Sequence, residues 1–405
     1  MQPYDWFIPE VEEFVIQRAV LTLKLNKAIR YYRELIVPGI GGVRFGRQFS
    51  WTLAALRIAP EIKKYSAVKI ANSIEALAGK LEYRKTGDVN LRGIRAFQRY
   101  EDEMSFDKLS QSKYYVRIPY RMATVRGLHG LGFTNQARFN SMQLTQIGND
   151  LADKFLYQDK GGKGGKSIEN ALIDWILNEK DINIPEGLIR QGITDDEKSI
   201  IRKRMLSDAV DNMSNPHRRA DLINVYKPSF MKKDFNMEEI KRNLPSAQQK
   251  EFGIAQAFDA MLSNARELIQ ECAKKVEDSG GSGTTADKIY KKVSKTTNIV
   301  VESGKKFLKI GEGSKILHAD SVNFARDICN LDKDEKQILL YVIERDGAIL
   351  KKEQGTVIKK GPLFFRREEI KNTDSENDNA EFINSDMSST REKIEQLYQL
   401  WSDCQ

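Results

Sequence analysis

Apolar residues recur every three or four positions along most of the chain, the spacing that places them on one face of an α-helix. Amphipathic helices are therefore expected over 10–36, 45–58, 67–81, 92–104, 106–113, 168–177, 196–213, 255–276, 337–344 and 388–401. Thr194 followed by Glu197 is typical of a capping box and marks one helix start. Residues 38–42 break the first helix, and their glycines suit a connector with positive φ.

Towards the end of the chain the pattern changes. Residues 348–370 contain short apolar runs around Gly355 and Gly361, which predicts a β-hairpin. The stretch 371–388 is rich in Asn, Asp, Ser and Glu, a composition typical of disorder. The helix expected at 388–401 could dock on another subunit or pack back on its own domain, and both interpretations stay open.

The stretch 108–149 follows a different order, with a strand, a helix at 122–130, a β-hairpin at 133–144 and a further helix. It contains no Asp or Glu. A helix that enters the major groove needs exposed arginine or polar side chains, and a neighbouring hairpin needs a cation near the phosphates. The candidate nucleic-acid contacts in and beside this helix are Lys113, Arg117, Arg121, Thr124, Arg126 and Arg138.

The order of residues in this stretch also resembles a known family. Residues 125–133, followed by Arg138-Phe139 and by Leu144-Thr145-x-x-Gly148, are similar to the recognition helix, wing and Leu-Thr-x-x-Gly of bacterial winged-helix DNA-binding proteins of the MarR and PadR kind. The resemblance covers residues 108–152 only. It implies a winged helix embedded in a larger helical body, with double-stranded DNA as the ligand.

Composition and charge are compatible with such a ligand. The 405 residues carry a formal net charge of +8 and a pI near 9.1, which favours an anionic partner. No signal-like segment opens the chain and no apolar run approaches the roughly 20 residues that cross a bilayer. We therefore expect a soluble, cytoplasmic protein with no membrane partner. The 3 cysteines and 3 histidines lack metal-ligand spacing, which predicts reduced thiols and neither a metal nor another cofactor.

Two segments invite a catalytic interpretation that the sequence does not support. Residues 160–167 match only the end of a phosphate-binding loop, because Lys160 stands where the first glycine belongs and a helix precedes the segment instead of a strand. A flexible linker is the better reading. His217 lies near Asp221, but no nucleophile stands at a readable spacing, so a solvated turn histidine is expected. No catalytic residue is predicted.

The predicted fold class is mainly α, a helical body with an embedded winged helix and a smaller α+β C-terminal region. The predicted divisions are 1–158 (helical, with the winged helix at about 92–156), 159–167 (Gly/Lys linker), 168–277 (helical), 278–286 (flexible linker), 287–370 (α+β, basic), 371–388 (disordered, acidic) and 389–405 (terminal helix). The lysines of 288–315 could track phosphates or simply face solvent.

The leading functional hypothesis is a non-catalytic nucleic-acid-binding subunit, for double-stranded DNA, in a larger bacterial complex. Its other protein subunits would include, for example, an ATPase or a nuclease, in a setting such as phage defence or mobile-element maintenance. Two alternatives stay open. The winged helix could serve only for protein docking, or the chain could be a nuclease whose carboxylates come together only on folding.

Overall fold

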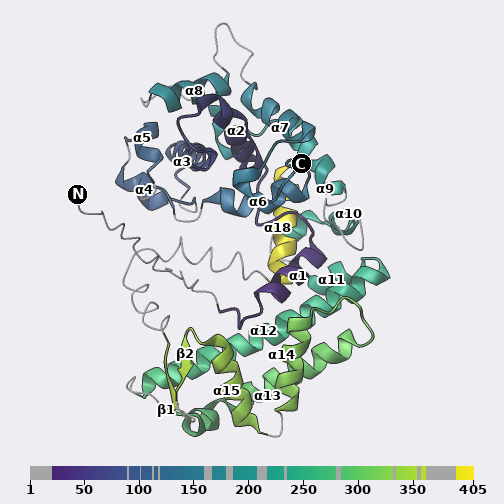
Figure 1. The fold of residues 1–405 in the computed structure, drawn as a ribbon. Coiled ribbons are helices and arrows are strands. Elements are labelled where there is room, and N and C mark those ends of the chain that lie inside the picture. Colours follow the sequence, from purple (N-terminus) through teal and green to yellow (C-terminus); the bar gives the residue numbers. More distant parts are fainter. Residues whose placement is uncertain are drawn as a thin grey trace, which may run out of the picture.

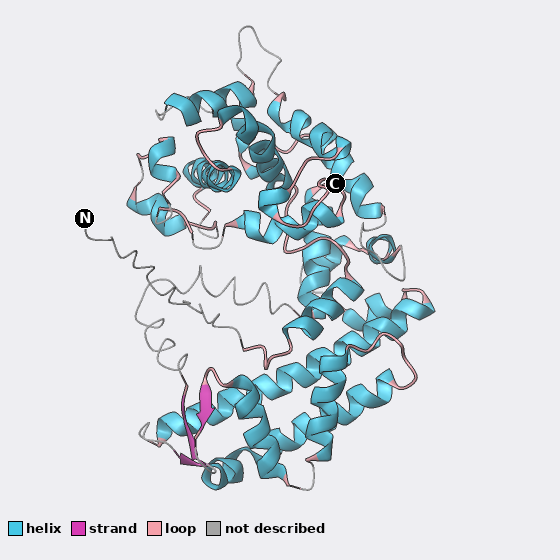
Figure 2. Cartoon of the chain, in the orientation of Figure 1, coloured by secondary structure: helices cyan, strands magenta, loops and turns pink. Residues whose placement is uncertain are grey.

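The computed structural model describes residues 21–88, 91–100, 102–111, 114–116, 119–158, 167–178, 186–207, 217–231, 235–279, 284–331, 334–353, 357–361 and 389–405. Within these ranges the chain is mainly α-helical with a small three-stranded antiparallel sheet, which confirms the predicted fold class at this level (Figure 1, Figure 2). The expectations for 10–20, for the Gly/Lys linker at 159–166 and for the acidic segment 371–388 concern residues outside these ranges.

The helices form an upper and a lower group in Figure 1, with α1 (Asn26–Ile36) and α18 (Thr390–Asp403) between them. The upper group contains α2 (Arg47–Ile62), α3 (Ala67–Thr86), α4 (Ile94–Arg99), α5 (Phe106–Leu109), α6 (Tyr120–Gly130), α7 (Gln146–Leu156), α8 (Ile168–Asn178) and α9 (Asp195–Leu206). The lower group contains α12 (Ser246–Asp278), α13 (Ala286–Gly311), α14 (Ala319–Asn330) and α15 (Glu335–Asp346). Shorter elements complete the chain: α10 (Arg218–Asn224), α11 (Met237–Arg242) and the 3-10 turns η1 (Phe139–Ser141), η2 (Glu186–Leu188), η3 (Arg190–Gly192) and η4 (Pro228–Met231).

Local sequence signals explain where several helices begin. The Ser66 hydroxyl accepts a hydrogen bond from the Lys69 N–H at the start of α3, at a distance of 3.2 Å. The predicted capping box is confirmed, because Thr194 and Glu197 each bond the other's backbone N–H at the start of α9. Helix α12 begins at Ser246, earlier than the predicted 255, because its first turns are too polar to show helical periodicity.

The sheet lies in the lower group and has the order β1-β3-β2. The predicted hairpin is confirmed, since β2 (Leu350–Lys352) and β3 (Val357–Lys360) pair antiparallel. Strand β1 (Thr284–Thr285) adds to the other edge of β3, with Thr284 opposite Ile358. The expectation of a flexible linker over 278–286 is therefore wrong at 284–285, where ladder hydrogen bonds to β3 fix the backbone.

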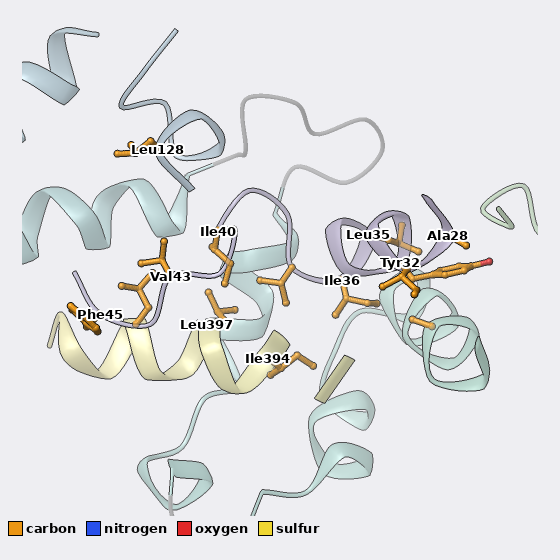
Figure 3. Packing of buried hydrophobic residues seen from close by; sticks show 14 of the residues in the cluster. Ala28, Tyr32, Leu35, Ile36, Ile40, Val43, Phe45, Leu128, Ile394 and Leu397 are labelled. Carbon is orange, nitrogen blue, oxygen red and sulfur yellow. The ribbon is translucent and has the colours of Figure 1, made fainter. Parts of the chain in front are cut away.

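The C-terminal helix α18 packs back on its own chain, which decides between the two interpretations left open by the sequence. Ile394, Leu397, Tyr398 and Leu400 are fully buried in it. Figure 3 shows Ile394 and Leu397 facing Ile40 and Val43 of the segment 37–46, which joins α1 to α2. Burial of this apolar face stabilises the contact without a partner subunit.

Polar contacts at both ends of α18 fix its position. The Asp259 carboxylate of α12 accepts the Thr390 backbone N–H at 2.6 Å and pairs with Arg33 of α1 at 2.8 Å. At the other end, Asp403 Oδ2 accepts the Gly46 N–H at 2.8 Å. The Lys393 ammonium donates to the Gly41 carbonyl. Helix α18 is thus bonded to α12 in the lower group and to the segment that enters α2 in the upper group.

The Asp403 contact predicts a pH-dependent contribution to stability. Burial raises the pKa of Asp403 above its ordinary value of 3.8, against smaller opposing effects of the Gly46 N–H and nearby cations. When burial raises the pKa of a carboxyl group, the folded protein favours the protonated form. The resulting stabilisation is complete at a pH below the pKa of the unfolded chain, and it is lost as the pH rises through the pKa of the folded protein. The free energy of unfolding of the wild type should therefore fall relative to that of Asp403→Asn as the pH rises above about 4.

Denaturant titrations of both proteins at several pH values measure this difference. Asparagine keeps an oxygen that can accept the Gly46 N–H but does not titrate, so it serves as the matched reference. A difference that stays constant, or that rises with pH, would show that Asp403 is not destabilised in its charged form.

Candidate nucleic-acid interface

Helix α6 begins over a buried carboxylate. Glu75 on α3 accepts the backbone N–H groups of Tyr120 at 2.5 Å and Arg121 at 2.9 Å, together with the Tyr115 hydroxyl at 2.9 Å. Burial raises the pKa of Glu75, and the backbone N–H bonds oppose that rise. A carboxylate at a helix N-terminus satisfies orphan N–H groups and the helix dipole. The N-terminus of α6 is thus closed from within the fold.

One face of α6 is pressed against the segment 37–46, and glycines permit the close approach. The Gly42 N–H donates to the Ala123 carbonyl at 3.0 Å. A Cβ added at Gly130 would lie 2.3 Å from Gly39 Cα, closer than atoms can pack. Gly39 has a φ of 69° and Gly41 a φ of 57°, which confirms the predicted connector with positive φ. The face of α6 that carries Ala123, Gly127 and Gly130 is therefore closed to a ligand.

After α6 the chain turns back on itself before α7, as the sequence predicts. Thr134 and Leu144 form an antiparallel β-bridge, and the Thr145 N–H donates to the Phe133 carbonyl at 3.0 Å. The turn between them contains η1. We call residues 131–145 the bridge loop. This single bridge falls short of the two-stranded wing implied by the family resemblance, so the winged helix stays a prediction.

Two of the six predicted contact residues are held inside the fold. Thr124 is fully buried and its hydroxyl donates to the Tyr120 carbonyl at 2.9 Å, so its predicted place on the exposed face of the helix is wrong. Arg121 is half-buried, donates from Nε to Asn72 Oδ1 at 2.9 Å and lies over the Phe139 ring at 4.8 Å. Burial lowers the pKa of Arg121, while Glu75 opposes this effect. Arg121 therefore joins α6, α3 and η1 and is only partly accessible.

Arg126 on α6 and Arg138 in the bridge loop are exposed, as predicted. Met122 lies one helical turn before Arg126 and is 44% exposed, a residue that the sequence did not single out. We call Met122, Arg126 and Arg138 the basic face. Its chain segment, 119–149, contains no carboxylate. Lys113 and Arg117 lie outside the described residues.

Other candidate chemistry finds no support in the described parts of the chain. There, no group of three or more His, Cys, Asp and Glu side chains is placed to hold a metal ion. His217 is exposed at the start of α10, and the nearby Asp221 carboxylate accepts a hydrogen bond from Gln248 at 2.7 Å. Among the described helices, none is both long enough and apolar enough to cross a bilayer.

The basic face is the candidate site because its residues are exposed and belong to one segment without Asp or Glu. It combines exposed guanidinium groups, one exposed apolar side chain and a rigid attachment to α3 through Arg121 and Glu75. Comparisons with protein-family models, with curated proteins and with solved structures find no match for this chain.

Proposed function

We propose that the chain binds double-stranded DNA through the basic face. The observation that carries the proposal is the exposure of Arg126 and Arg138 on a segment, 119–149, that contains no Asp or Glu. Arginine guanidinium groups bind phosphate oxygens in paired hydrogen bonds and release counterions from the duplex. Without carboxylates in the segment, this attraction is not offset by repulsion from its own residues.

The surroundings of α6 favour contacts with the DNA backbone over base reading. A recognition helix usually contacts bases with its N-terminal residues. In α6 this end is closed by Glu75, and Thr124 is buried. Few side chains are left to read base edges, so we propose a binding mode with low sequence specificity, dominated by phosphate contacts.

A second candidate function is protein docking, favoured by the exposed Met122 beside Arg126. Methionine and arginine are both enriched at protein interfaces. In that case the chain would be a subunit of a larger assembly, and the basic face would contact another protein. Salt dependence separates the two candidates, because phosphate contacts weaken steeply with added salt, whereas an interface of buried apolar groups weakens little.

The proposal predicts a loss of duplex affinity in the variant Arg126→Ala with Arg138→Ala. The logarithm of the affinity falls as the logarithm of the salt concentration rises. Each lost phosphate contact reduces the steepness of this fall by about 0.9, so the double substitution should reduce it by about 1.8. Fluorescence anisotropy with a labelled duplex, repeated over a range of salt concentrations, measures this slope for the full chain.

The control is Arg30→Ala with Arg326→Ala, which removes the same charge from exposed arginines on α1 and α14. Its slope should match that of the wild type. Equal slopes for wild type, the Arg126/Arg138 variant and the control would exclude the basic face as the DNA-binding surface.

A further inference from the structure

A surface groove of about 410 Å³ lies between α11, α12 and α13, far along the chain from the basic face. Its volume is within the range of pockets that hold small ligands or parts of larger ones. Helix α12 contributes the small residues Gly253, Ala257 and Ala260 to its lining. The ammonium group of Lys241 lies 3.5 Å from the position that a Cβ at Gly253 would occupy.

Each of the three helices contributes one lysine to the groove: Lys241 from α11, Lys250 from α12 and Lys306 from α13. Glu238 is the one carboxylate among its lining residues, and Gln249 and Gln256 add neutral hydrogen-bonding groups. Within the described residues, none of the three lysines makes an ion pair. Three cations thus converge on one hollow with a net positive charge.

The lysine of α13 belongs to a longer row. Besides Lys305, which pairs with Glu302, the exposed lysines on this helix are Lys288, Lys291, Lys292, Lys295, Lys306 and Lys309. At 3.6 residues per turn they face the same side, and at 1.5 Å per residue Lys288 and Lys306 are about 27 Å apart. Helix α13 therefore places these six lysines on one face, whereas Lys315 follows the end of the helix.

The carboxylates that face this row are mostly engaged by other groups. Glu302 pairs with Lys305 at 3.1 Å, and Asp287 pairs with Lys336 of α15. Glu271 of α12 accepts the Thr296 hydroxyl at 2.7 Å. These contacts reduce local repulsion of an anion, although exposed pairs are weak and screened by salt. The row therefore keeps an excess of positive charge that leads into the groove.

We propose that this lysine groove, formed by Lys241, Lys250 and Lys306, binds phosphate groups of a nucleic-acid strand that continues along α13. Lysine binds phosphate as a point charge without fixed geometry, which suits a backbone read by charge. A free phosphate compound would need only the groove. The row of lysines extending from it favours a polymer with regularly spaced phosphates.

The test uses the full chain and the variant Lys250→Glu with Lys306→Glu. Both side chains are exposed, so the fold should be kept, and circular dichroism checks this. Anisotropy titrations use labelled oligonucleotides, single-stranded and duplex. At low salt the variant should bind at least about 10-fold more weakly, and its salt slope for a single strand should fall by about 1.4.

Two further variants make the result specific. Lys27→Glu with Lys63→Glu reverses the same charge at exposed positions on α1 and after α2, and should bind oligonucleotides within about 2-fold of the wild type. Lys291→Glu with Lys295→Glu should weaken oligonucleotide binding but leave the binding of pyrophosphate, measured by calorimetry, unchanged. Unchanged oligonucleotide affinity in the Lys250/Lys306 variant would overturn the proposal, whatever pyrophosphate does.

The lysine groove could bind nucleic acid whether or not the basic face does. If the Arg126/Arg138 variant binds duplex normally while the Lys250/Lys306 variant does not, the lysine groove stands and the proposed role of the basic face falls. If instead the Lys250/Lys306 variant binds normally and the Arg126/Arg138 variant does not, the lysine groove is excluded and the basic face is supported. The two sites can therefore be judged separately in the same titrations.

Discussion

Replacing Gly148 by alanine is expected to lower the free energy of unfolding by about 3 kcal/mol, although alanine is the better helix former. Gly148 lies in the first turn of α7, against the bridge loop. A Cβ there would lie 2.0 Å from the Phe133 carbonyl oxygen. This carbonyl also accepts the Thr145 N–H, so it cannot move away without breaking the bridge loop. Urea denaturation of the wild type and Gly148→Ala measures the loss.

Gly253→Ala is the matched control, since Gly253 is also inside a helix, α12. The nearest atom to an added Cβ there is the Lys241 ammonium at 3.5 Å, an ordinary contact at the end of a flexible side chain. Alanine should leave stability unchanged or raise it by up to about 1 kcal/mol. If both substitutions have the same effect, α7 does not pack against the bridge loop as closely as described.

Tyr398→Ala is expected to destabilise the protein by about 3–5 kcal/mol, the range found for buried aromatic side chains. Tyr398 is fully buried in α18, and its hydroxyl donates to the Leu222 carbonyl of α10 at 3.0 Å. Its ring lies 5.1 Å from that of Tyr226. Removal of the Tyr398 ring would leave a cavity where α18 meets α10 and η4. Tyr398→Phe keeps the ring and should cost only about 1 kcal/mol, from the lost hydrogen bond.

Tyr100→Ala provides the comparison for this substitution. Tyr100 is 43% exposed and stacks on Tyr114 with ring centroids 5.2 Å apart. Tyr100→Ala removes the same atoms as Tyr398→Ala, but these atoms are much more exposed to solvent. The expected loss in the free energy of unfolding is therefore about 1 kcal/mol or less. Denaturant midpoints of the three variants rank them. Similar midpoints for Tyr398→Ala and Tyr100→Ala would mean that α18 is not part of the core.

Periodicity predicted the helices whose apolar stripes are regular. The predicted 67–81 and 337–344 fall within α3 and α15, and the helix at 388–401 corresponds to α18. Where α18 packs was not predictable, because its contacts, residues 37–46 and Leu222, are far away in the sequence. Strand β1 was missed for the same reason: two threonines in a Gly/Ser-rich stretch become a strand only when β3 is beside them.

The candidate site shows the same limit at the level of single residues. Spacing on a helix states which side chains share a face, but not which face meets solvent. Spacing makes Thr124 and Arg126 equal candidates, yet Thr124 is fully buried and Arg126 is exposed. Arg121 is held by Asn72 on α3, a partner that no local signal indicates. Met122 could have been identified from its spacing to Arg126, had the exposed side been known.

Photo-crosslinking from Met122 tests most directly whether DNA lies on the basic face. A photoreactive residue placed there would project from the exposed side of α6 next to Arg126, since Met122 is 44% exposed. The same residue at Leu177, which is 49% exposed on α8, is the control. We expect irradiation with a labelled duplex to crosslink the protein from position 122 and not from 177. Crosslinking from 177 alone, or equally from both positions, would contradict binding through the basic face.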